Sequence, residues 1–246
     1  MMHLEVMGEY WEGLVDEVIE HWDAAGIEKG VILATWMASR RSNDITLDAF
    51  TRYPDRFIPF GHVRPVDNWE EEIDRITQEL GWTGLKLHQR ELWYAGGNAL
   101  RTVREIVGRA QKSGLRVVKI HLHEYETIET LSREFPDIAW ILPHMGQYMV
   151  PNAPLRAYCD LARERDNVYL DTSVTDQYYD LDLAVRWAGP DKVTFASDGF
   201  MYSPLVERAK IDSLRLPTPH RAKPLSDEEY AMIMGGTMAK ILGIDK

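Results

Sequence analysis

One stretch in the middle of the chain decides the fold: Val117-Val118-Lys119-Ile120-His121-Leu122-His123. Its β-branched residues favour a β-strand, in which successive side chains point to opposite faces. Lys119, His121 and His123 therefore share one face, and only apolar side chains occupy the other. If helices cover the apolar face, both histidines lie on the opposite side, toward the carboxyl end of the strand. The stretch thus predicts a helix-covered strand that ends in imidazole groups.

The same pattern, a short apolar run followed by a helix-like segment, repeats along the chain. Strand-like runs lie at residues 30–36, 57–63, 83–88, 115–123, 138–144, 167–172 and 192–197. Helix-like segments, with apolar residues three and four positions apart, lie at residues 11–25, 69–80, 99–113, 126–135, 155–165 and 181–188. Strands that alternate with helices in this way predict a parallel sheet with helical crossovers.

The spacing of the strands separates two possible architectures. Strands begin about every 20–30 residues, which fits a (β/α)8 barrel of about 250 residues. A doubly wound open sheet is the alternative, but it usually carries a glycine-rich turn after its first strand, and the chain has no G-x-G-x-x-G or phosphate-loop pattern. We therefore expect an α/β protein with one (β/α)8 TIM-barrel domain that spans residues 1–246.

The composition excludes several classes of protein. The chain has 28 Lys and Arg against 39 Asp and Glu, a net charge of −11, which disfavours broad binding to nucleic acid. No apolar run reaches the roughly 18 residues that a membrane span needs, and no signal-peptide pattern opens the sequence. Cys159 is the single cysteine, so disulfide frameworks and cysteine-based zinc clusters are excluded. We expect a cytoplasmic protein that binds neither nucleic acid nor membranes.

Ionisable residues gather where the predicted strands end, which is where a parallel barrel carries its chemistry. They are Arg64, Lys86, His88, His121, His123, His144, Asp171 and Asp198. Neutral imidazoles combined with one carboxylate suit zinc or another divalent first-row metal. The joint placement of His121, His144 and Asp198 at three strand ends favours a metal site. A structural role is the stronger alternative for His88 taken alone, and a role outside direct metal contact for His123.

Four phrases of the sequence resemble the amidohydrolase superfamily. They are Gly-Leu-Lys-Leu-His at 84–88, Val-Lys-Ile-His at 118–121, Ile-Leu-Pro-His-Met-Gly at 141–146 and Phe-Ala-Ser-Asp at 195–198. Their order and spacing are similar to the amidohydrolase-2 branch, with its aminocarboxymuconate-semialdehyde decarboxylases and dicarboxylate lactonases. The resemblance runs from about residue 26 to residue 243. It implies a distorted barrel of the metal-dependent hydrolase type with one divalent metal ion, zinc in the first place and manganese as the alternative.

The resemblance also implies which residues bind the metal. It assigns His121 and Asp198 as ligands and His144 as a ligand or as the neighbour of the metal-bound water. Members of the branch open with a strand ending His-x-His, whereas this chain opens Met1-Met2-His3, so His3 matches the second of those ligands and Met1 stands at the first. We therefore expect His3 as a further ligand on a truncated or atypical first strand. Either upstream residues are missing from this chain or one ligand has been lost.

Cationic residues at neighbouring strand ends indicate an anionic substrate. Arg64 and Lys86 are the expected anchors of its carboxylate, because Arg presents a planar fork that matches carboxylate geometry. His88 and His123 complete the expected substrate site. We expect a metal-dependent hydrolase that acts on a small carboxylate-bearing substrate through metal-activated water, with Asp198 and His144 as catalytic residues.

Two alternatives stay open. The first is non-oxidative decarboxylation of an aromatic or unsaturated carboxylic acid on the same site, and the second is an inactive, ligand-depleted barrel that acts as a binding protein. The expected partners are a small anionic substrate and, in a homodimer or higher homo-oligomer, further copies of the chain.

Overall fold

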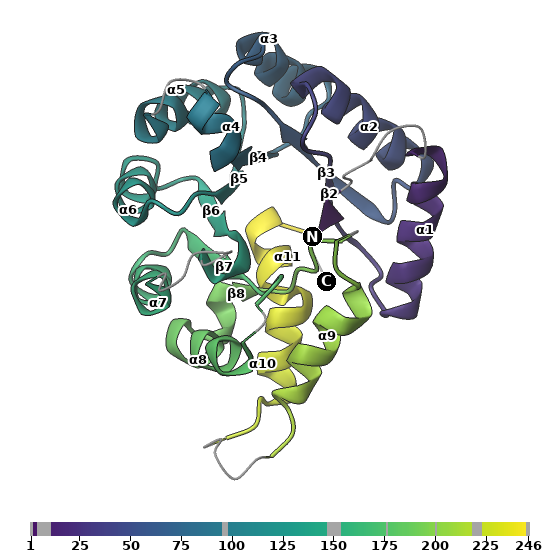
Figure 1. Ribbon diagram of the computed structural model, residues 1–246, viewed down its shortest axis with the longest axis vertical. Helices are drawn as coiled ribbons and strands as arrows, with labels where there is room; N and C mark the ends of the chain where they lie inside the picture. The colour runs from purple at the N-terminus through teal and green to yellow at the C-terminus, as the bar shows by residue number, and fades with distance from the viewer. Residues whose placement is uncertain are drawn as a thin grey trace.

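Eight parallel strands form one sheet in chain order, and the sheet curls into a ring (Figure 1). The computed structural model describes residues 2–3, 11–94, 98–146, 154–175, 177–199, 201–217 and 223–244, with backbone alone at 2–3, 11–13 and 93–94. The strands are β1 (Met2–His3), β2 (Gly30–Leu33), β3 (Phe57–His62), β4 (Gly84–His88), β5 (Val117–His121), β6 (Ala139–Leu142), β7 (Val168–Asp171) and β8 (Val193–Thr194). The expected TIM-barrel architecture is confirmed, and its first strand is short, with two residues paired to Ile32 and Leu33 of β2.

Helices cover the outside of the ring and its amino end. They are α1 (Trp11–Ala24), α2 (Ser39–Arg52), α3 (Trp69–Asp74), α4 (Gln89–Tyr94), α5 (Ala99–Lys112), α6 (Tyr125–Glu134), α7 (Leu155–Glu164), α8 (Tyr178–Ala188), α9 (Pro204–Ser213), α10 (Asp227–Ala231) and α11 (Thr237–Leu242). The six helix-like segments of the sequence are confirmed as α1, α3, α5, α6, α7 and α8. A wider π-type turn continues α3 over Arg75–Glu79, and another (Met232–Gly236) joins α10 to α11.

Helix α2 was not predicted, because four of the six residues that it buries are polar. Asn43 donates to the backbone oxygen of His62 and to Glu72, and the Thr46 hydroxyl accepts from the backbone N–H of Ala34. A helix that packs through hydrogen bonds in this way lacks the apolar spacing on which the sequence analysis depends.

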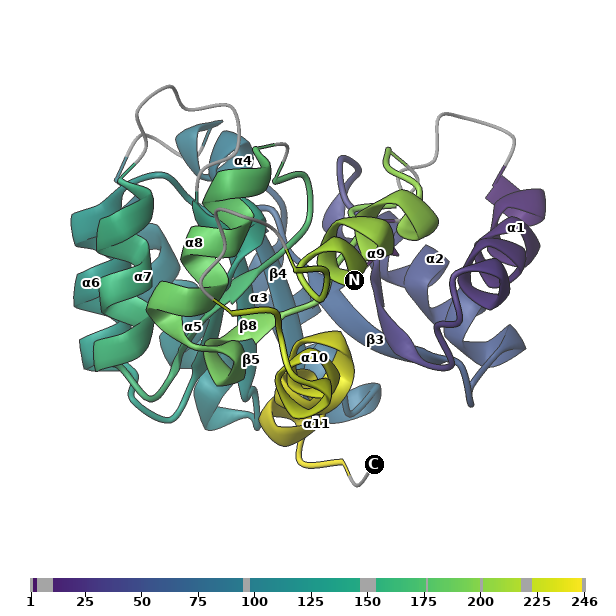
Figure 2. The same ribbon diagram turned by 90° about the horizontal axis from the view of Figure 1, so that it is seen from below.

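The apolar core has an outer and an inner layer. Between the strands and helices lie side chains such as Leu85, Leu87 and Ile120, all buried. Inside the ring, Phe60, Ile141 and their neighbours form a second cluster, and Met238, Ile241 and Leu242, at and near α11, pack against it. Helix α11 lies in the middle of the ring in Figure 1 and below the strands in Figure 2. It closes the amino end of the barrel, so the carboxyl end is left for chemistry.

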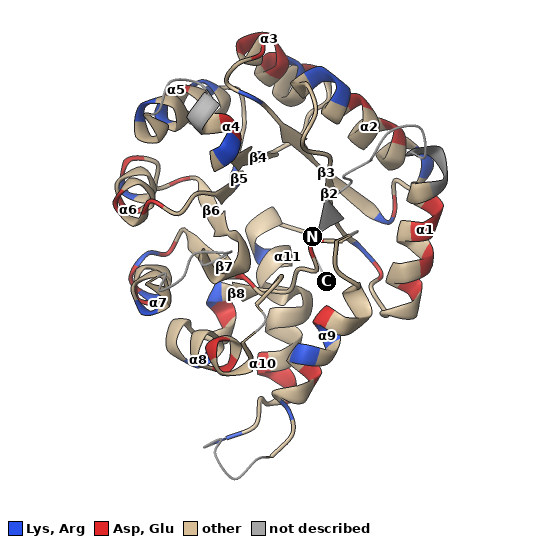
Figure 3. Ribbon diagram, in the orientation of Figure 1, with Lys and Arg blue, Asp and Glu red and all other residues tan. Residues whose placement is uncertain are grey.

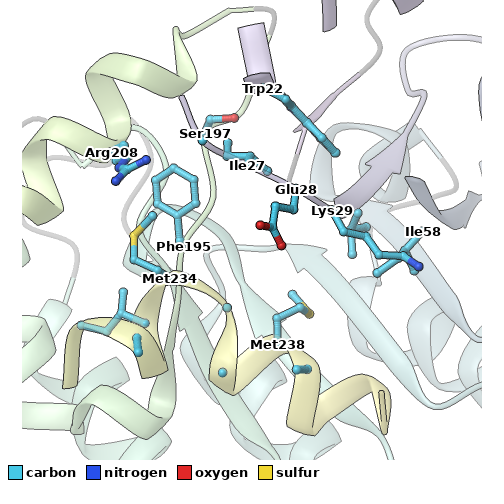
Figure 4. A pocket seen from close by; sticks show the side chains of 18 of the residues that line it. Trp22, Ile27, Glu28, Lys29, Ile58, Phe195, Ser197, Arg208, Met234 and Met238 are labelled. Atoms are coloured by element: carbon cyan, nitrogen blue, oxygen red, sulfur yellow. The ribbon is translucent and has the colours of Figure 1, made fainter. Parts of the chain in front are cut away.

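A cavity of about 600 Å³ lies between β2 and β8, beside the short first strand (Figure 4). Gly30 and Val31 line it from β2, and Phe195 and Ser197 line it from the end of β8. In Figure 4 the side chains of Met234 and Met238 border it from the segment that joins α10 to α11 and from α11 itself. Among the described residues, strand pairing runs from β1 to β8 and no ladder joins β8 to β1. The cavity is therefore at the seam of the barrel.

Charge is distributed unevenly between the surface and the interior. Acidic and basic residues alternate along the outer helices (Figure 3), whereas Lys86, Lys119 and Asp171 are fully buried on the strands. No helix in the described part of the chain is long and apolar enough to cross a membrane.

Candidate active site

The inner wall of the barrel becomes polar toward the carboxyl ends of the strands. On β4 and β5 the apolar side chains Leu87 and Ile120 pack against the helices, as their alternation predicts. The opposite face carries the basic groups, and the strand register pairs Lys86 with Lys119 and His88 with His121. Two neighbouring strands thus each carry a lysine on the inner face and a histidine two residues later on the same face.

Four imidazole rings lie close together at the carboxyl end of the barrel, with His121 at their centre. Its ring centroid lies 4.4 Å from that of His88, 5.0 Å from that of His123 and 5.0 Å from that of His144. Burial lowers the pKa of His144 to about 4, and burial together with the charge of Lys86 lowers the pKa of His121 far below its ordinary value. Both rings are therefore neutral at pH 7, which is the state in which imidazole binds a metal or accepts a proton.

A chain of buried polar contacts runs from β5 to His144. The ammonium nitrogen of Lys119 lies 2.7 Å from Oδ2 of Asp171, and both side chains are fully buried. The other carboxylate oxygen accepts three hydrogen bonds, from the backbone N–H of His144 (3.1 Å), the backbone N–H of Ser173 (3.0 Å) and the Ser173 hydroxyl (2.5 Å). Burial alone would raise the pKa of Asp171, but Lys119, His144 and these donors outweigh it and lower that pKa, so the carboxylate is ionised.

Lys86 differs from its neighbour Lys119 in that no ion-pair partner lies beside it in the described part of the chain. Its side chain is fully buried, and within the described residues its Nζ makes no hydrogen bond. Burial, followed by the charge of Lys119, lowers the pKa of Lys86 to about 7, while Asp198, Asp171 and Glu91 act in the opposite direction. A buried amine without a partner costs stability, which makes Lys86 a candidate ligand-binding group.

Asp198 lies four residues beyond the end of β8, because that strand ends at Thr194 rather than at the predicted residue 197. Its side chain is 6% exposed, and its charge acts on both Lys86 and His144. Asp198 and His144 have φ values of 55° and 56°. A non-glycine residue in this left-handed region is strained, and such residues concentrate at functional sites.

The donor chemistry of this site fits a divalent metal ion. Two neutral imidazoles, His121 and His144, stand with the carboxylate of Asp198 at the same end of the barrel, and this is a ligand set that zinc accepts. In the described part of the chain, however, no three His, Cys, Asp or Glu side chains lie close enough together to hold an ion. The side chain of His3, the fourth predicted ligand, lies outside the described residues, although its backbone belongs to β1.

The remaining predicted site residues lie at the rim with protein partners. Arg64 faces two carboxylates, with Nε 3.8 Å from Glu91 and NH1 4.0 Å from Asp67. His88 accepts a hydrogen bond at Nδ1 from the backbone of Arg90 (3.2 Å). His123 is half-buried, and burial lowers its pKa. Lys86 thus lies deep inside the barrel, while Arg64, His88 and His123 lie at the carboxyl end of the barrel.

Sequence reasoning missed His62, which ends β3 and is fully buried. Its Nε2 lies 2.8 Å from Oε2 of Glu91 on α4, and the strand register places it beside Lys86. The signal was present, because His62 ends an apolar strand as His88 and His121 do. The sequence analysis instead assigns Arg64, two residues later, to the substrate site.

Several solved structures share this fold. The 2,6-dihydroxybenzoate decarboxylase of Rhizobium is 18% identical, with a TM-score of 0.69, over 98% of this chain and 97% of its own. A 5-carboxyvanillate decarboxylase of Novosphingobium aromaticivorans, solved with manganese and 3-methoxy-4-hydroxy-5-nitrobenzoic acid, is 17% identical, with a TM-score of 0.67, over 97% and 86%. The 4-oxalomesaconate hydratase of Rhodopseudomonas palustris is 16% identical, with a TM-score of 0.68, over 97% and 84%. At these identities the similarity demonstrates the fold.

Sequence comparison identifies the family. No curated protein matches the chain, but the sequence model described as amidohydrolase matches residues 15–244, nearly its whole length. The matched range contains the polar strand ends from Arg64 to Asp198. The chain therefore belongs to the amidohydrolase family of enzymes.

Proposed function

We propose that this enzyme is a metal-dependent hydrolase that acts on a small carboxylate-bearing substrate at the carboxyl ends of its strands. One observation carries the proposal: the amine of Lys86 is buried without a hydrogen-bond partner among the described residues, below neutral imidazoles and a carboxylate. The amine supplies a site for an anion, and the imidazoles supply proton acceptors.

The metal ion would be held by His121, Asp198 and His3, with His144 as a fourth ligand or, in the arrangement that we propose, as the base beside the attacking water. When bound, a divalent metal ion supplies Lewis acidity, which polarises a carbonyl oxygen and lowers the pKa of water. We propose zinc for this position and manganese as the alternative. The manganese bound in the Novosphingobium decarboxylase, which shares this fold, supports the proposal of a divalent metal ion.

The side chains of the chain itself carry the proton transfers and the substrate contacts. His144 and Asp198 accept the proton of the attacking water, because a neutral imidazole and a carboxylate are both bases at pH 7. Lys86 binds the carboxylate of the substrate inside the barrel, with Arg64, His88 and His123 around the entrance. We also propose that the enzyme is cytoplasmic and forms a homodimer or higher homo-oligomer.

Decarboxylation is the second candidate, and the names of the Rhizobium and Novosphingobium neighbours support it. Lys86 would hold the carboxylate of such a substrate in the same way. Loss of CO₂ from an aromatic or unsaturated acid, however, requires a proton donor for the carbon left behind. Burial lowers the pKa of His144 to about 4, so the ring is neutral at pH 7 and would have to take up a proton before it could donate one. Hydrolysis instead begins with acceptance of a proton, which the neutral ring can perform.

A two-product assay tests the proposal. Protein loaded with zinc or manganese is incubated with carboxylate-bearing lactones and esters, and separately with aromatic carboxylic acids. Acid release and CO₂ release are then measured side by side.

We expect acid release from the lactones and esters, and its loss in Lys86→Met and Asp198→Asn. The matched control is Lys192→Met, which removes a lysine near the amino end of β8. CO₂ release alone would replace hydrolysis by decarboxylation. Hydrolysis that survives Lys86→Met unchanged would contradict the role of Lys86.

A further inference from the structure

On one side, the ring of His144 contacts Ser173. Its Nδ1 lies 2.9 Å from the hydroxyl oxygen of Ser173 and 3.1 Å from the backbone carbonyl oxygen of the same residue. The Ser173 hydroxyl in turn lies 2.5 Å from Oδ1 of Asp171. All three residues are buried, so the hydrogen atoms in this group can be assigned by counting donors and acceptors.

The count begins at Asp171. Lys119 lies 2.7 Å from Oδ2 of Asp171, and three donors point at its Oδ1, so the group is a carboxylate that can only accept. The Ser173 hydroxyl has one hydrogen atom and places it on Asp171. Its oxygen can therefore only accept from His144. The carbonyl oxygen of Ser173 can only accept as well.

Two acceptors thus face Nδ1 of His144, and Nδ1 must carry the hydrogen. The opposite arrangement, with the hydrogen on Nε2, would set the lone pair of Nδ1 against the oxygen lone pairs of Ser173. A buried contact of this kind is strongly disfavoured. When the ring is neutral, its lone pair is therefore on Nε2, which is on the side of the ring away from Ser173.

We propose that Ser173 and Asp171 are positioning residues that hold His144 in its Nδ1–H tautomer and leave Nε2 as the basic nitrogen of the site. Asp171 also accepts the backbone N–H of His144 (3.1 Å) in its left-handed conformation, so the same two residues orient both the backbone and the ring. Lys119 keeps Asp171 ionised, so Asp171 accepts from the Ser173 hydroxyl and that hydroxyl accepts from His144. Only the use of Nε2 as a base rests on the proposed function; the tautomer itself does not.

Nitrogen-15 NMR of the metal-free protein tests the tautomer directly. Long-range proton–nitrogen correlations at pH 7 distinguish a protonated from an unprotonated ring nitrogen, and the signals that disappear in His144→Gln identify this residue. We expect Nδ1 of His144 to be protonated and Nε2 unprotonated. A wild-type ring with its hydrogen on Nε2 would overturn the proposal.

Variants of Ser173 test the positioning role. In Ser173→Ala the hydroxyl acceptor is lost and the backbone carbonyl remains, so we expect a mixture in which the Nε2–H form of His144 becomes detectable beside the Nδ1–H form. Ser173→Thr, which retains a hydroxyl, should restore the wild-type signals. The matched control is Ser132→Ala, which removes a buried hydroxyl on α6 that, among the described residues, bonds only the backbone oxygen of Glu129; it should leave the His144 signals unchanged. Unchanged His144 signals in a folded Ser173→Ala would remove the Ser173 hydroxyl from the role. Because these spectra need neither metal nor substrate, they stand even if no hydrolysis is found.

Discussion

At the scale of single residues, the two buried lysines have opposite effects on stability. Lys119 has a carboxylate at 2.7 Å, whereas Lys86, its partner in the strand register, has none among the residues that the structure describes. A buried pair is costly to break and a buried lone charge is costly to keep. The ion pair of Lys119 therefore stabilises the fold, and the unpaired amine of Lys86 destabilises it.

Lys86→Met should stabilise the protein while it abolishes carboxylate binding. Burial lowers the pKa of Lys86 from 10.5 to about 7, so between these values the unfolded chain binds more protons than the folded one. The contribution of Lys86 to the free energy of unfolding therefore rises with pH over this range. We expect the variant to gain at least about 1 kcal/mol at pH 6 and less at pH 9, as measured by urea unfolding. A loss of stability at pH 6 would contradict this account.

Asp171→Ala should be strongly destabilising, because it leaves the ammonium group of Lys119 buried without its carboxylate. Breaking such a pair typically costs about 3–5 kcal/mol. The control is the double variant Asp171→Ala with Lys119→Met, in which no charge remains unpaired. If the pair is the reason, the double variant is the more stable of the two in urea unfolding. Equal stability would instead assign the loss to the hydrogen bonds that Asp171 accepts.

At the scale of elements, the backbone conformation of the connection from β6 to α7 requires a glycine at position 146. Gly146 has a φ of 78°, and a Cβ there would lie 2.6 Å from the ring of Tyr158 on α7. The left-handed conformation and the close approach of the helix both exclude a side chain. This connection also contains His144, so helix packing and the geometry of the site depend on the same turn.

Gly146→Ala should therefore lose stability for two reasons. The left-handed backbone costs about 1–2 kcal/mol for a residue with a Cβ, and the clash with Tyr158 adds about 1–3 kcal/mol. Gly81→Ala is the matched control, because Gly81 has a φ of 68° but nothing within 4 Å of its Cβ position. We expect the control to show the backbone cost alone in thermal unfolding. Equal losses in the two variants would show that Tyr158 adds nothing.

At the scale of the whole molecule, strand pairing among the described residues leaves a seam between β8 and β1. Within those residues β1 pairs with Ile32 and Leu33 of β2, and the cavity of about 600 Å³ lies along Gly30 and Val31. The N–H of Gly30 donates to Arg56 on the β3 side, so by alternation the peptide groups of Val31 face the seam. A strand that continues β1 backwards would pair there.

An added strand should stabilise the seam. Extending the amino terminus by Thr-Val-Ala-Ile-Val offers a short strand, and Thr-Pro-Ala-Pro-Val is the matched control, because proline cannot donate to a ladder. We expect the first extension to slow hydrogen exchange at the Val31 amide and to raise Tm by about 2–4 °C, the shift that 1 kcal/mol produces at this chain length. If both extensions behave alike, the cavity does not accept a strand.

The sequence by itself determined the strands, the parallel barrel and the group of basic residues at its mouth. These depend on local alternation, and His121 and Lys119 share a face because of the two-residue period of their own strand. The tertiary structure decided which of those groups are paired. Helix α2 escaped prediction because the groups that it bonds, on His62 and Glu72, are distant in sequence. The pairing of Lys119 with Asp171, and the lack of such a partner for Lys86 among the described residues, likewise depend on how β4, β5 and β7 meet, since a buried charge is stabilised only by the groups that folding brings to it.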